Sequence, residues 1–592
     1  MKRFFFSFLG ALAGVWVSIL LFGLLIFITI GVIAASSASE VDVPKVKKQS
    51  VLTITLSGEV VDRESPKNIL DEIYGNDVRQ IPLNTLVSSI KSAAQDSKIE
   101  GIYLDCKGLS AGLAQIEAVV NALNEFSKSG KWIMAYGDSY SQADYIIASS
   151  ADSLFVNPIG VIDIHGLAST TLYFKNLLEK AGVEVQVVKV GTFKSAVEPF
   201  ILNDMSDANR LQTSEFLDNI WDHLKNTIAQ GRKVTVEKVS DWADSFSYTK
   251  DVEFYLKNNL ADATLYRHQM DSLLARLSGL HENKDKPNLI EFDKYALARD
   301  DNKKSVKNKK QIAVLYAVGD ITENGEGGIA SERLVPQILD LAEDEDVDAL
   351  VLRVNSGGGS AFASEQIWEA LQQFKTITGK PFYVSMGDYA ASGGYYISCG
   401  ADKIFAEPVT LTGSIGIFGL IPNAEKLLSD KIGINTATVA TNKGQFPTFY
   451  KAMTPDQKAA MQSMVENGYE LFAKRCAEGR SLPVDSIKAI AEGRVWSGHK
   501  ALEIGLVDYM GGLDAAIAFA ASELNCDGDY YIKEYPKVNF KWWEEMLDMS
   551  KTIKMSVIKE FVGEENMKFY DLTNYLKNID PLQARMDFIE IN

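Results

Sequence analysis

The chain has 592 residues, 46% of them hydrophobic and 23% charged, and its formal net charge is -18 at pH 7. This composition excludes a largely disordered chain and a protein buried mainly in a membrane. The acidic balance argues against a nucleic-acid-binding surface, which needs clustered Lys and Arg side chains. Because a single hydrophobic core stops growing at roughly 250 to 300 residues, we expect more than one core.

An apolar run from residue 4 to about residue 35 follows Lys2 and Arg3. About 20 apolar residues cross a bilayer as a helix, so the run predicts a transmembrane anchor over residues 1–36. A cleaved signal peptide is the alternative, but its apolar region should be only about 7 to 15 residues long. Basic residues on both sides leave the orientation undecided. Since long domains are translocated largely regardless of charge, we expect the domains outside the cytoplasm, behind a stalk at residues 37–50.

Strand, turn and helix follow in the same order in two halves of the chain. In the first half, hydrophobic patterning predicts strands at 51–56 and 101–104 and a helix around 116–126. In the second half, it predicts strands at 311–316 and 349–352 and a helix around 367–374. We therefore expect an α/β fold with largely parallel sheets, built from repeats at residues 51–280 and 311–530.

Two further segments flank the second repeat. Residues 281–310 are crowded with charge and predict an exposed connector, whose lysines are expected to be solvated. Apolar residues within 531–592 recur at helical spacing and predict a helical extension. We expect its apolar face to serve core or subunit packing, with a helix lying on a membrane as the alternative.

Cysteine and histidine usage gives no sign of a metal or cofactor. The four cysteines form no CxxC pair, so neither a zinc cage nor a dense disulfide framework is indicated. The five histidines form no metal-ligand pair such as HExxH. We therefore expect no metal and no cofactor.

One serine is distinguished by an internal repeat. Residues 137–145 resemble residues 387–395, and in this register Ser392 faces Gln142. A duplicated fold made unequal at one polar position suggests that one copy keeps the chemistry while the other supports it. A serine at a helix N-terminus is most often a cap, so the position alone is a weak signal.

A glycine-rich segment offers backbone donors for a negative charge. Residues 354–360 end a predicted strand, and their glycines let the backbone approach a ligand. We expect the N–H groups of Gly358 and Gly393 to form an oxyanion hole. A phosphate cradle is the rival, but the GxxxxGK[ST] pattern is missing. A purely structural tight turn remains a further alternative.

A nucleophilic serine needs a base, and none of the five histidines lies in a recognisable partner motif. A neutral lysine is the other option, and its pKa must fall from about 10.4 toward about 7 to 8. Burial away from carboxylates lowers the pKa of a lysine. Lys194 is the candidate because apolar and small residues flank it within residues 191–200. The hypothesis requires the carboxylate of Glu198 to point away from this amine.

Taken together, these motifs closely resemble the long form of signal peptide peptidase A, also called protease IV. The matching segments, which occur in order, are residues 191–200, 355–360, 391–396, 411–416, 493–498 and 505–508. The resemblance covers about residues 50 to 530 plus the anchor. One departure is Gly357, where the family often has Pro, so we expect a looser loop there.

The resemblance implies a Ser-Lys dyad serine peptidase with tandem ClpP/crotonase-like domains. Ser392 would be the nucleophile, Lys194 the general base, and Ser414 would orient the lysine. The implied substrates are cleaved signal peptides bound as extended strands in an apolar groove. The resemblance also implies an inner-membrane protein with a periplasmic catalytic domain, assembled as a dome-like homotetramer.

Two other functions are compatible with the sequence. Residues 108–112 match the GxSxG elbow of esterases, with Ser110 as nucleophile. The internal repeat aligns this segment with residues 355–360, which makes Ser110 a turn residue instead. The non-enzymatic alternative is a catalytically inert, membrane-tethered crotonase-like scaffold whose glycines are purely structural.

Overall fold

The computed structural model describes residues 10, 14–18, 20–24, 44–64, 78–280, 286–299, 309–325, 328–537 and 582–586. Most of the predicted anchor therefore lies outside the described residues. Of the part that is described, residues 14–18 and 20–24 are helical. Among the described helices, none combines the length and the apolar character needed to cross a bilayer. The anchor and its orientation stay predictions.

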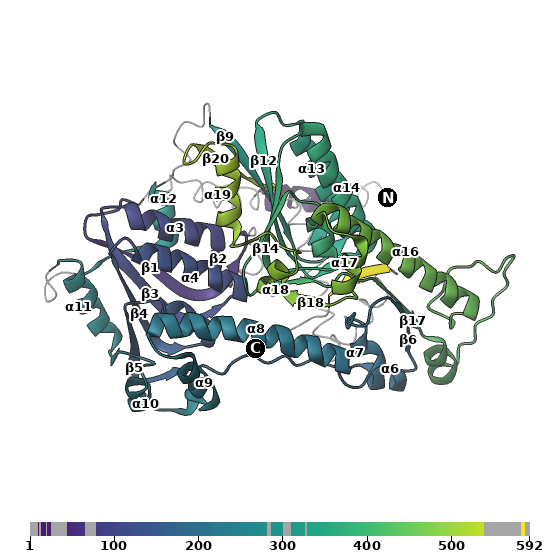
Figure 1. The fold of residues 1–592 in the computed structure, drawn as a ribbon, viewed down its shortest axis with the longest axis horizontal. Coiled ribbons are helices and arrows are strands. Elements are labelled where there is room, and N and C mark those ends of the chain that lie inside the picture. Colours follow the sequence, from purple (N-terminus) through teal and green to yellow (C-terminus); the bar gives the residue numbers. More distant parts are fainter. Residues whose placement is uncertain are drawn as a thin grey trace.

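The first repeat is built on a seven-stranded sheet (Figure 1). Its central strands pair in parallel and are β1 (Ser50–Val61), β3 (Ile99–Ser110), β4 (Trp132–Tyr140) and β5 (Ser153–Ile162). The short outer strands are β2 (Gln80–Pro82), β7 (Ala263–Thr264) and β8 (Asn288–Glu291). Strands covered on both faces need near-continuous apolar runs, and the predicted strands at 51–56 and 101–104 lie inside β1 and β3.

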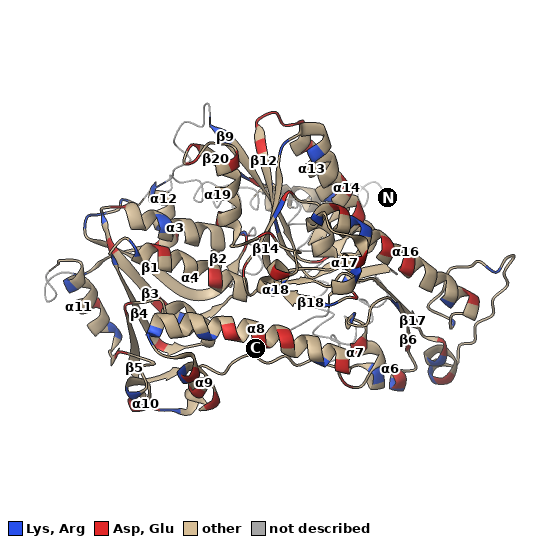
Figure 2. Ribbon diagram, viewed as in Figure 1, with Lys and Arg blue, Asp and Glu red and all other residues tan. Residues whose placement is uncertain are grey.

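Helices cover this sheet. They are α3 (Leu83–Gln95), α4 (Leu113–Ser127), α5 (Gln142–Ala148), α6 (Lys175–Ala181), α7 (Glu198–Ile201), α8 (Asp207–Arg232), α9 (Val236–Asp244), the 3-10 turn η1 (Ser247–Thr249), α10 (Val252–Lys257), α11 (Arg267–Leu277) and α12 (Phe292–Arg299). The helix predicted around 116–126 lies inside α4. The long helix α8 runs along the lower side of Figure 1 and carries charges of both signs in Figure 2.

The second repeat is built on an eight-stranded sheet. Its strands are β9 (Lys310–Val318), β12 (Val347–Ser356), β14 (Phe382–Ala391), β15 (Lys403–Ala406), β16 (Leu411–Gly413), β18 (Val495–Ser497), β19 (Tyr509–Met510) and β20 (Tyr530–Tyr535). The strands β9, β12 and β14 are parallel neighbours. The helical segments are α13 (Ser331–Glu343), α14 (Ala361–Thr378), α15 (Gly393–Ser398), the π-helix η3 (Leu427–Ile432), α16 (Pro455–Arg480), α17 (Val484–Ile490), α18 (Gly498–Glu503) and α19 (Leu513–Glu523). The predicted α/β fold with two repeated units is confirmed.

A third, six-stranded sheet joins the two halves. In spatial order its strands are β11 (Ile329–Ala330), β10 (Ile321–Thr322), β13 (Gly358–Ser360), β21 (Leu582–Arg585), β17 (Phe418–Asn423) and β6 (Glu184–Lys189). The strand β6 belongs to the first half and pairs antiparallel with β17 of the second half. In Figure 1, β21 is the yellow strand near β17 and β6. The segment after β6, which contains Lys194, is thereby fixed against the second repeat.

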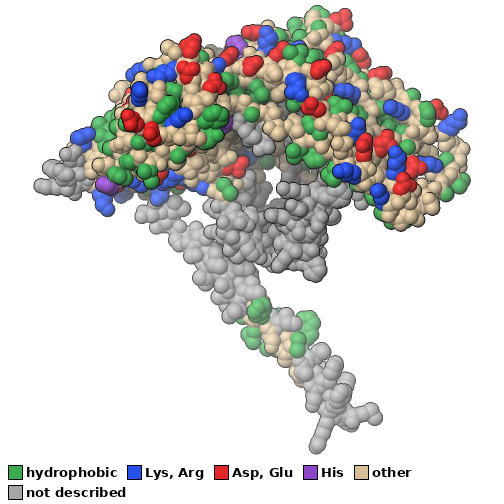
Figure 3. All heavy atoms as spheres, turned by 90° about the horizontal axis from the view of Figure 1, so that it is seen from below, with side chains coloured by type: hydrophobic (Ala, Val, Ile, Leu, Met, Phe, Trp, Pro, Cys, Tyr) green, Lys and Arg blue, Asp and Glu red, His purple; other side chains and the backbone are tan. Residues whose placement is uncertain are grey.

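A buried polar cluster also ties the halves together. The guanidinium of Arg353 at the end of β12 lies 2.7 Å from a carboxylate oxygen of Asp62, which follows β1. The side-chain amide of Asn355 donates to both Asp62 and Asp388, at 2.7 and 3.1 Å. Removing one partner of a buried ion pair leaves a costly unpaired charge, so this cluster fixes the relative position of the halves. On the outside, Lys and Arg are interspersed with Asp and Glu over the face in Figure 3.

The structure differs from the sequence prediction in two segments. Within the predicted exposed connector, β8 pairs in parallel with β1 and α12 packs against α3, because Ile290, Phe292 and Tyr295 bury their side chains. The charged residues around these three hid the short apolar pattern. Within the predicted helical extension, β20 and β21 are strands, while residues 538–581 and 587–592 lie outside the described residues.

Candidate active site

Ser392 lies at the junction of β14 and α15 and is fully buried. Its backbone has φ 54° and ψ -112°, a conformation that L-residues rarely adopt. Such strain persists only where the surrounding structure enforces it, and it clusters at functional sites. The Ser392 side chain makes no capping hydrogen bond with α15, so the ordinary use of a serine at a helix start does not apply here.

Lys194 reaches this serine from the other half of the chain. Its Nζ atom lies 2.7 Å from Oγ of Ser392 and 3.1 Å from both Oγ and the carbonyl oxygen of Ser414. The lysine is 1% exposed. The hydroxyl of Ser414 in turn donates to the carbonyl of Gly493 at 3.2 Å. The structure thus brings the three residues named from the sequence into one hydrogen-bonded group.

The lysine segment is held from both of its flanks. The amide nitrogen of Gln212, in α8, donates to the carbonyl of Phe193 at 3.1 Å and to Oγ of Ser195 at 3.2 Å. The amide oxygen of Gln212 accepts from the backbone N–H of Val495 at 3.2 Å. This buried glutamine therefore links the lysine segment to β18. Sequence reasoning missed it, because a single polar residue in a long helix reads as a surface position.

Gly493 allows this close approach. A Cβ atom at Gly493 would lie 2.7 Å from the backbone nitrogen of Lys194, and its φ of +77° also favours glycine. The next residue, Arg494, places its guanidinium over the rings of Phe193 and Trp496, 4.8 and 4.3 Å from their centroids. The lysine backbone is therefore packed between the two halves of the chain.

The carboxylate of Glu198 is directed to the start of α8. It accepts hydrogen bonds from the hydroxyl of Ser206 at 2.6 Å, the backbone N–H of Ser206 at 3.2 Å and the side-chain amide of Asn209 at 3.2 Å. These contacts give Glu198 a structural role at the helix N-terminus. They agree with the requirement that its charge be turned away from Lys194.

The two glycines assigned to the oxyanion hole are neighbours in space. A Cβ atom at Gly358 would lie 2.7 Å from the backbone nitrogen of Gly393, and Gly358 has φ +103°. The N–H of Gly358 donates to Oγ of Ser356 at 3.1 Å. For Gly358 to bind an oxyanion, this N–H must be shared with the incoming oxygen or released by rotation of the Ser356 hydroxyl.

A cavity of about 910 Å³ adjoins the site and is lined by both halves of the chain. Aromatic rings on its wall include Phe174, Phe200 and Phe418. Ser110 also lines it, as the exposed last residue of β3 rather than as the expected turn residue. The cavity is the apolar space next to the candidate nucleophile.

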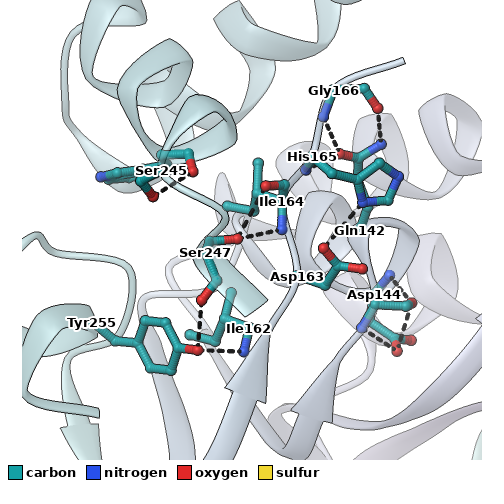
Figure 4. A network of polar contacts seen from close by, with 12 residues as sticks. Gln142, Asp144, Ile162, Asp163, Ile164, His165, Gly166, Ser245, Ser247 and Tyr255 are labelled. Carbon is teal, nitrogen blue, oxygen red and sulfur yellow. Dashed lines mark hydrogen bonds and ion pairs between the residues drawn. The ribbon is translucent and has the colours of Figure 1, made fainter. Parts of the chain in front are cut away.

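The position opposite Ser392 in the first repeat has a different use (Figure 4). The amide oxygen of Gln142 accepts from the backbone N–H groups of His165 and Gly166, both at 3.0 Å, and its amide nitrogen donates to the carbonyl of Gly166 at 2.8 Å. All the printed capacity of this side chain holds one loop in place. Gln142 therefore serves the fold of the first repeat.

Known proteins resemble this chain in both repeats. The model of peptidase family S49 matches residues 125–281 and 375–527. "Protease 4" of Salmonella typhi is 37% identical over 489 residues, covering 80% of this chain and 78% of that protein. "Serine protease SPPA, chloroplastic" of Arabidopsis thaliana is 30% identical and covers 81% of this chain and 70% of that protein. "Putative signal peptide peptidase SppA" of Enterococcus faecium is 34% identical and covers 34% of this chain and 61% of that protein.

Proposed function

The chain belongs to peptidase family S49 and is a serine peptidase, and on that premise we propose that Ser392 is its nucleophile and Lys194 its general base. The observation that carries this assignment is the 2.7 Å separation of Lys194 Nζ and Ser392 Oγ. General bases act at about 2.6 to 3.2 Å from the proton donor, so no rearrangement is needed for proton transfer. Because each half supplies one of the two groups, one chain completes one site.

The proposed reaction is acyl transfer. The neutral amine of Lys194 accepts the proton of Ser392, and the resulting alkoxide attacks a peptide carbonyl. Burial of the amine favours its neutral form, because water no longer stabilises the ammonium. Ser414 orients the amine, and the N–H groups of Gly393 and Gly358 bind the oxyanion. Lys194 then passes the proton to the leaving amine, and water releases the acyl-enzyme.

We propose cleaved signal peptides as the substrates, at a membrane. One relative carries the name signal peptide peptidase, and the motifs of this sequence resemble that family. An extended peptide would bind beside β13 and β17, next to the cavity, by adding a strand to the sheet. The anchor at residues 1–36, the periplasmic placement of the catalytic domains, the homotetramer and the domain boundaries given above belong to the same proposal.

The test is cleavage of synthetic signal peptides by full-length protein in detergent or lipid. We expect Ser392→Ala to abolish cleavage and Ser110→Ala to leave it intact. The opposite pattern would favour the GxSxG esterase arrangement. Equal cleavage by wild type and Ser392→Ala, or none by either, would favour the inert scaffold.

A further inference from the structure

The short strand β21 lies between the two strand edges that border the candidate site. It pairs antiparallel with β13, where Ala584 faces Gly359, and antiparallel with β17, where Gln583 faces Phe418. Neighbouring strands lie about 4.8 Å apart, so β13 and β17 are separated by a slot one strand wide. Backbone donors and acceptors line both sides of this slot. That is the geometry with which an extended peptide is bound by strand addition.

The carbonyl oxygen of Ala584 lies against the two glycines assigned to the oxyanion hole. A Cβ atom at Gly358 would be 2.2 Å from this oxygen, and one at Gly393 would be 3.0 Å from it. The carbonyl that a serine peptidase attacks must direct its oxygen at these donors, because the developing charge is bound there. The peptide bond between Ala584 and Arg585 therefore occupies the place of a bond to be cut by Ser392.

The side chains flanking this bond differ in size and charge. Ala584 is fully buried and belongs to the core cluster of the second repeat. Arg585 is 8% exposed, and its guanidinium forms an ion pair with Asp320, which follows β9. Met586 is buried and lines the cavity beside the site. The slot thus has a small, enclosed position before the bond and an acidic residue after it.

We propose that β21 occupies the substrate groove as a substrate does, and that the groove selects a small side chain before the cleaved bond and a basic one after it. Asp320 is then a specificity-determining residue of the peptidase. The segment of residues 582–586 competes with external peptides for the same groove. The inference rests on the proposed function, since it takes Ser392 and the two glycines as the reacting site.

The selectivity is tested with full-length enzyme and two quenched peptides that contain Leu-Gln-Ala-Arg-Met or Leu-Gln-Ala-Glu-Met. We expect cleavage between Ala and Arg, mapped by mass spectrometry, and a higher kcat/KM for the Arg peptide. Asp320→Lys should reverse the preference, each peptide changing by about 2- to 5-fold because the carboxylate is half exposed to water. Cleavage at another bond, or a preference unchanged in Asp320→Lys, overturns the inference.

The competition is tested with two variants that weaken the internal segment. Ala584→Trp places a large ring where only a methyl group is enclosed, and Arg585→Glu brings two carboxylates together. For both, we expect the KM of an external peptide to fall several-fold with kcat unchanged. Lys533→Glu is the matched control, because it breaks a surface ion pair with Asp344 elsewhere in the C-terminal part and should leave KM unchanged.

The outcomes separate this inference from the proposed function. An unchanged KM in both β21 variants, with cleavage still dependent on Ser392, overturns the internal occupant and leaves the nucleophile assignment standing. Loss of every Ser392-dependent cleavage in wild-type enzyme overturns the proposed function itself.

Discussion

The two repeats use the same strand-to-helix junction in opposite ways. In the first repeat Ser141 caps α5, its Oγ accepting from the backbone N–H of Asp144 at 3.1 Å, and Gln142 holds a loop. In the second repeat Ser392 makes no cap and adopts a positive φ, and its Oγ lies at the amine of Lys194 instead. The comparison teaches that a reactive serine arises where the local hydrogen bonds that would normally satisfy it are given up.

The backbone donors facing that junction differ as well. In the first repeat the carboxylate of Asp144 accepts from the N–H groups of Gly108 and Leu109, at 3.0 and 3.2 Å. In the second repeat the residue at the position of Asp144 is Gly394. The carbonyl oxygen of Ala584 lies in the corresponding space beside Gly358. The first repeat therefore fills its own anion pocket, while the second leaves room for a substrate oxygen.

The largest effect is expected from removing either member of the proposed dyad. Lys194→Met and Ser392→Ala should each lower kcat by about 10³-fold or more, because nucleophile and base act as one unit. Gln142→Ala should leave kcat unchanged, since its hydrogen bonds serve a loop of the first repeat. Steady-state peptide hydrolysis measures all three. A large loss in Gln142→Ala with little loss in Lys194→Met would invert the roles of the repeats.

A smaller effect is expected from closing the second anion pocket. A methyl group at Gly358 would lie 2.2 Å from the Ala584 oxygen, so Gly358→Ala should lower kcat by about 10²-fold. Gly108→Ala is the matched control, because it changes the equivalent residue, also at positive φ, where a Cβ atom meets nothing within 4 Å. Parallel kinetics of the two variants decide the matter. Equal losses would mean that backbone strain alone explains the effect.

The filled pocket of the first repeat should matter for stability only. Asp144→Ala leaves the N–H groups of Gly108 and Leu109 without their acceptor, which costs about 1–3 kcal/mol. We expect the apparent Tm to fall by several degrees while kcat at lower temperature is retained. Calorimetry together with peptide hydrolysis provides both numbers. Loss of kcat in a folded Asp144→Ala protein would show that the first repeat contributes more than support.

The smallest effect concerns a buried carboxyl between the repeats. Burial, followed by the carboxylates of Glu117 and Asp514, raises the pKa of Glu407 to about 8. An unfolded glutamate titrates near about 4.3, so the folded chain holds this proton more tightly and loses stability as pH rises from about 4.3 to about 8. Glu407→Gln should therefore raise Tm relative to wild type more at pH 9 than at pH 5. A difference that is independent of pH would contradict this assignment.

The sequence predicted the parts of the molecule that repeat or that carry a motif. The strands β1, β3, β9 and β12 follow from apolar runs, and the internal repeat singled out Ser392 against Gln142. The contact between Lys194 and Ser392 was predicted through resemblance. Composition alone would not place a lysine 198 positions away against that serine.

Features that depend on contacts across the chain were not predicted. Gln212 in α8 and Asp320 after β9 carry no pattern, because a single polar residue reads the same on a solvated surface. The strand β21 is four residues long, and it exists only because two strand edges of the second half receive it. Such pairings are set by tertiary structure and leave little trace in local sequence.

The rate at which a fluorophosphonate probe labels the protein tests most directly whether Lys194 activates Ser392. Labelling followed by peptide mass spectrometry should place the probe on Ser392 in wild-type protein and show a rate lower by about 10³-fold in Lys194→Met. A label on another serine, or an equal rate after Lys194→Met, would contradict the account.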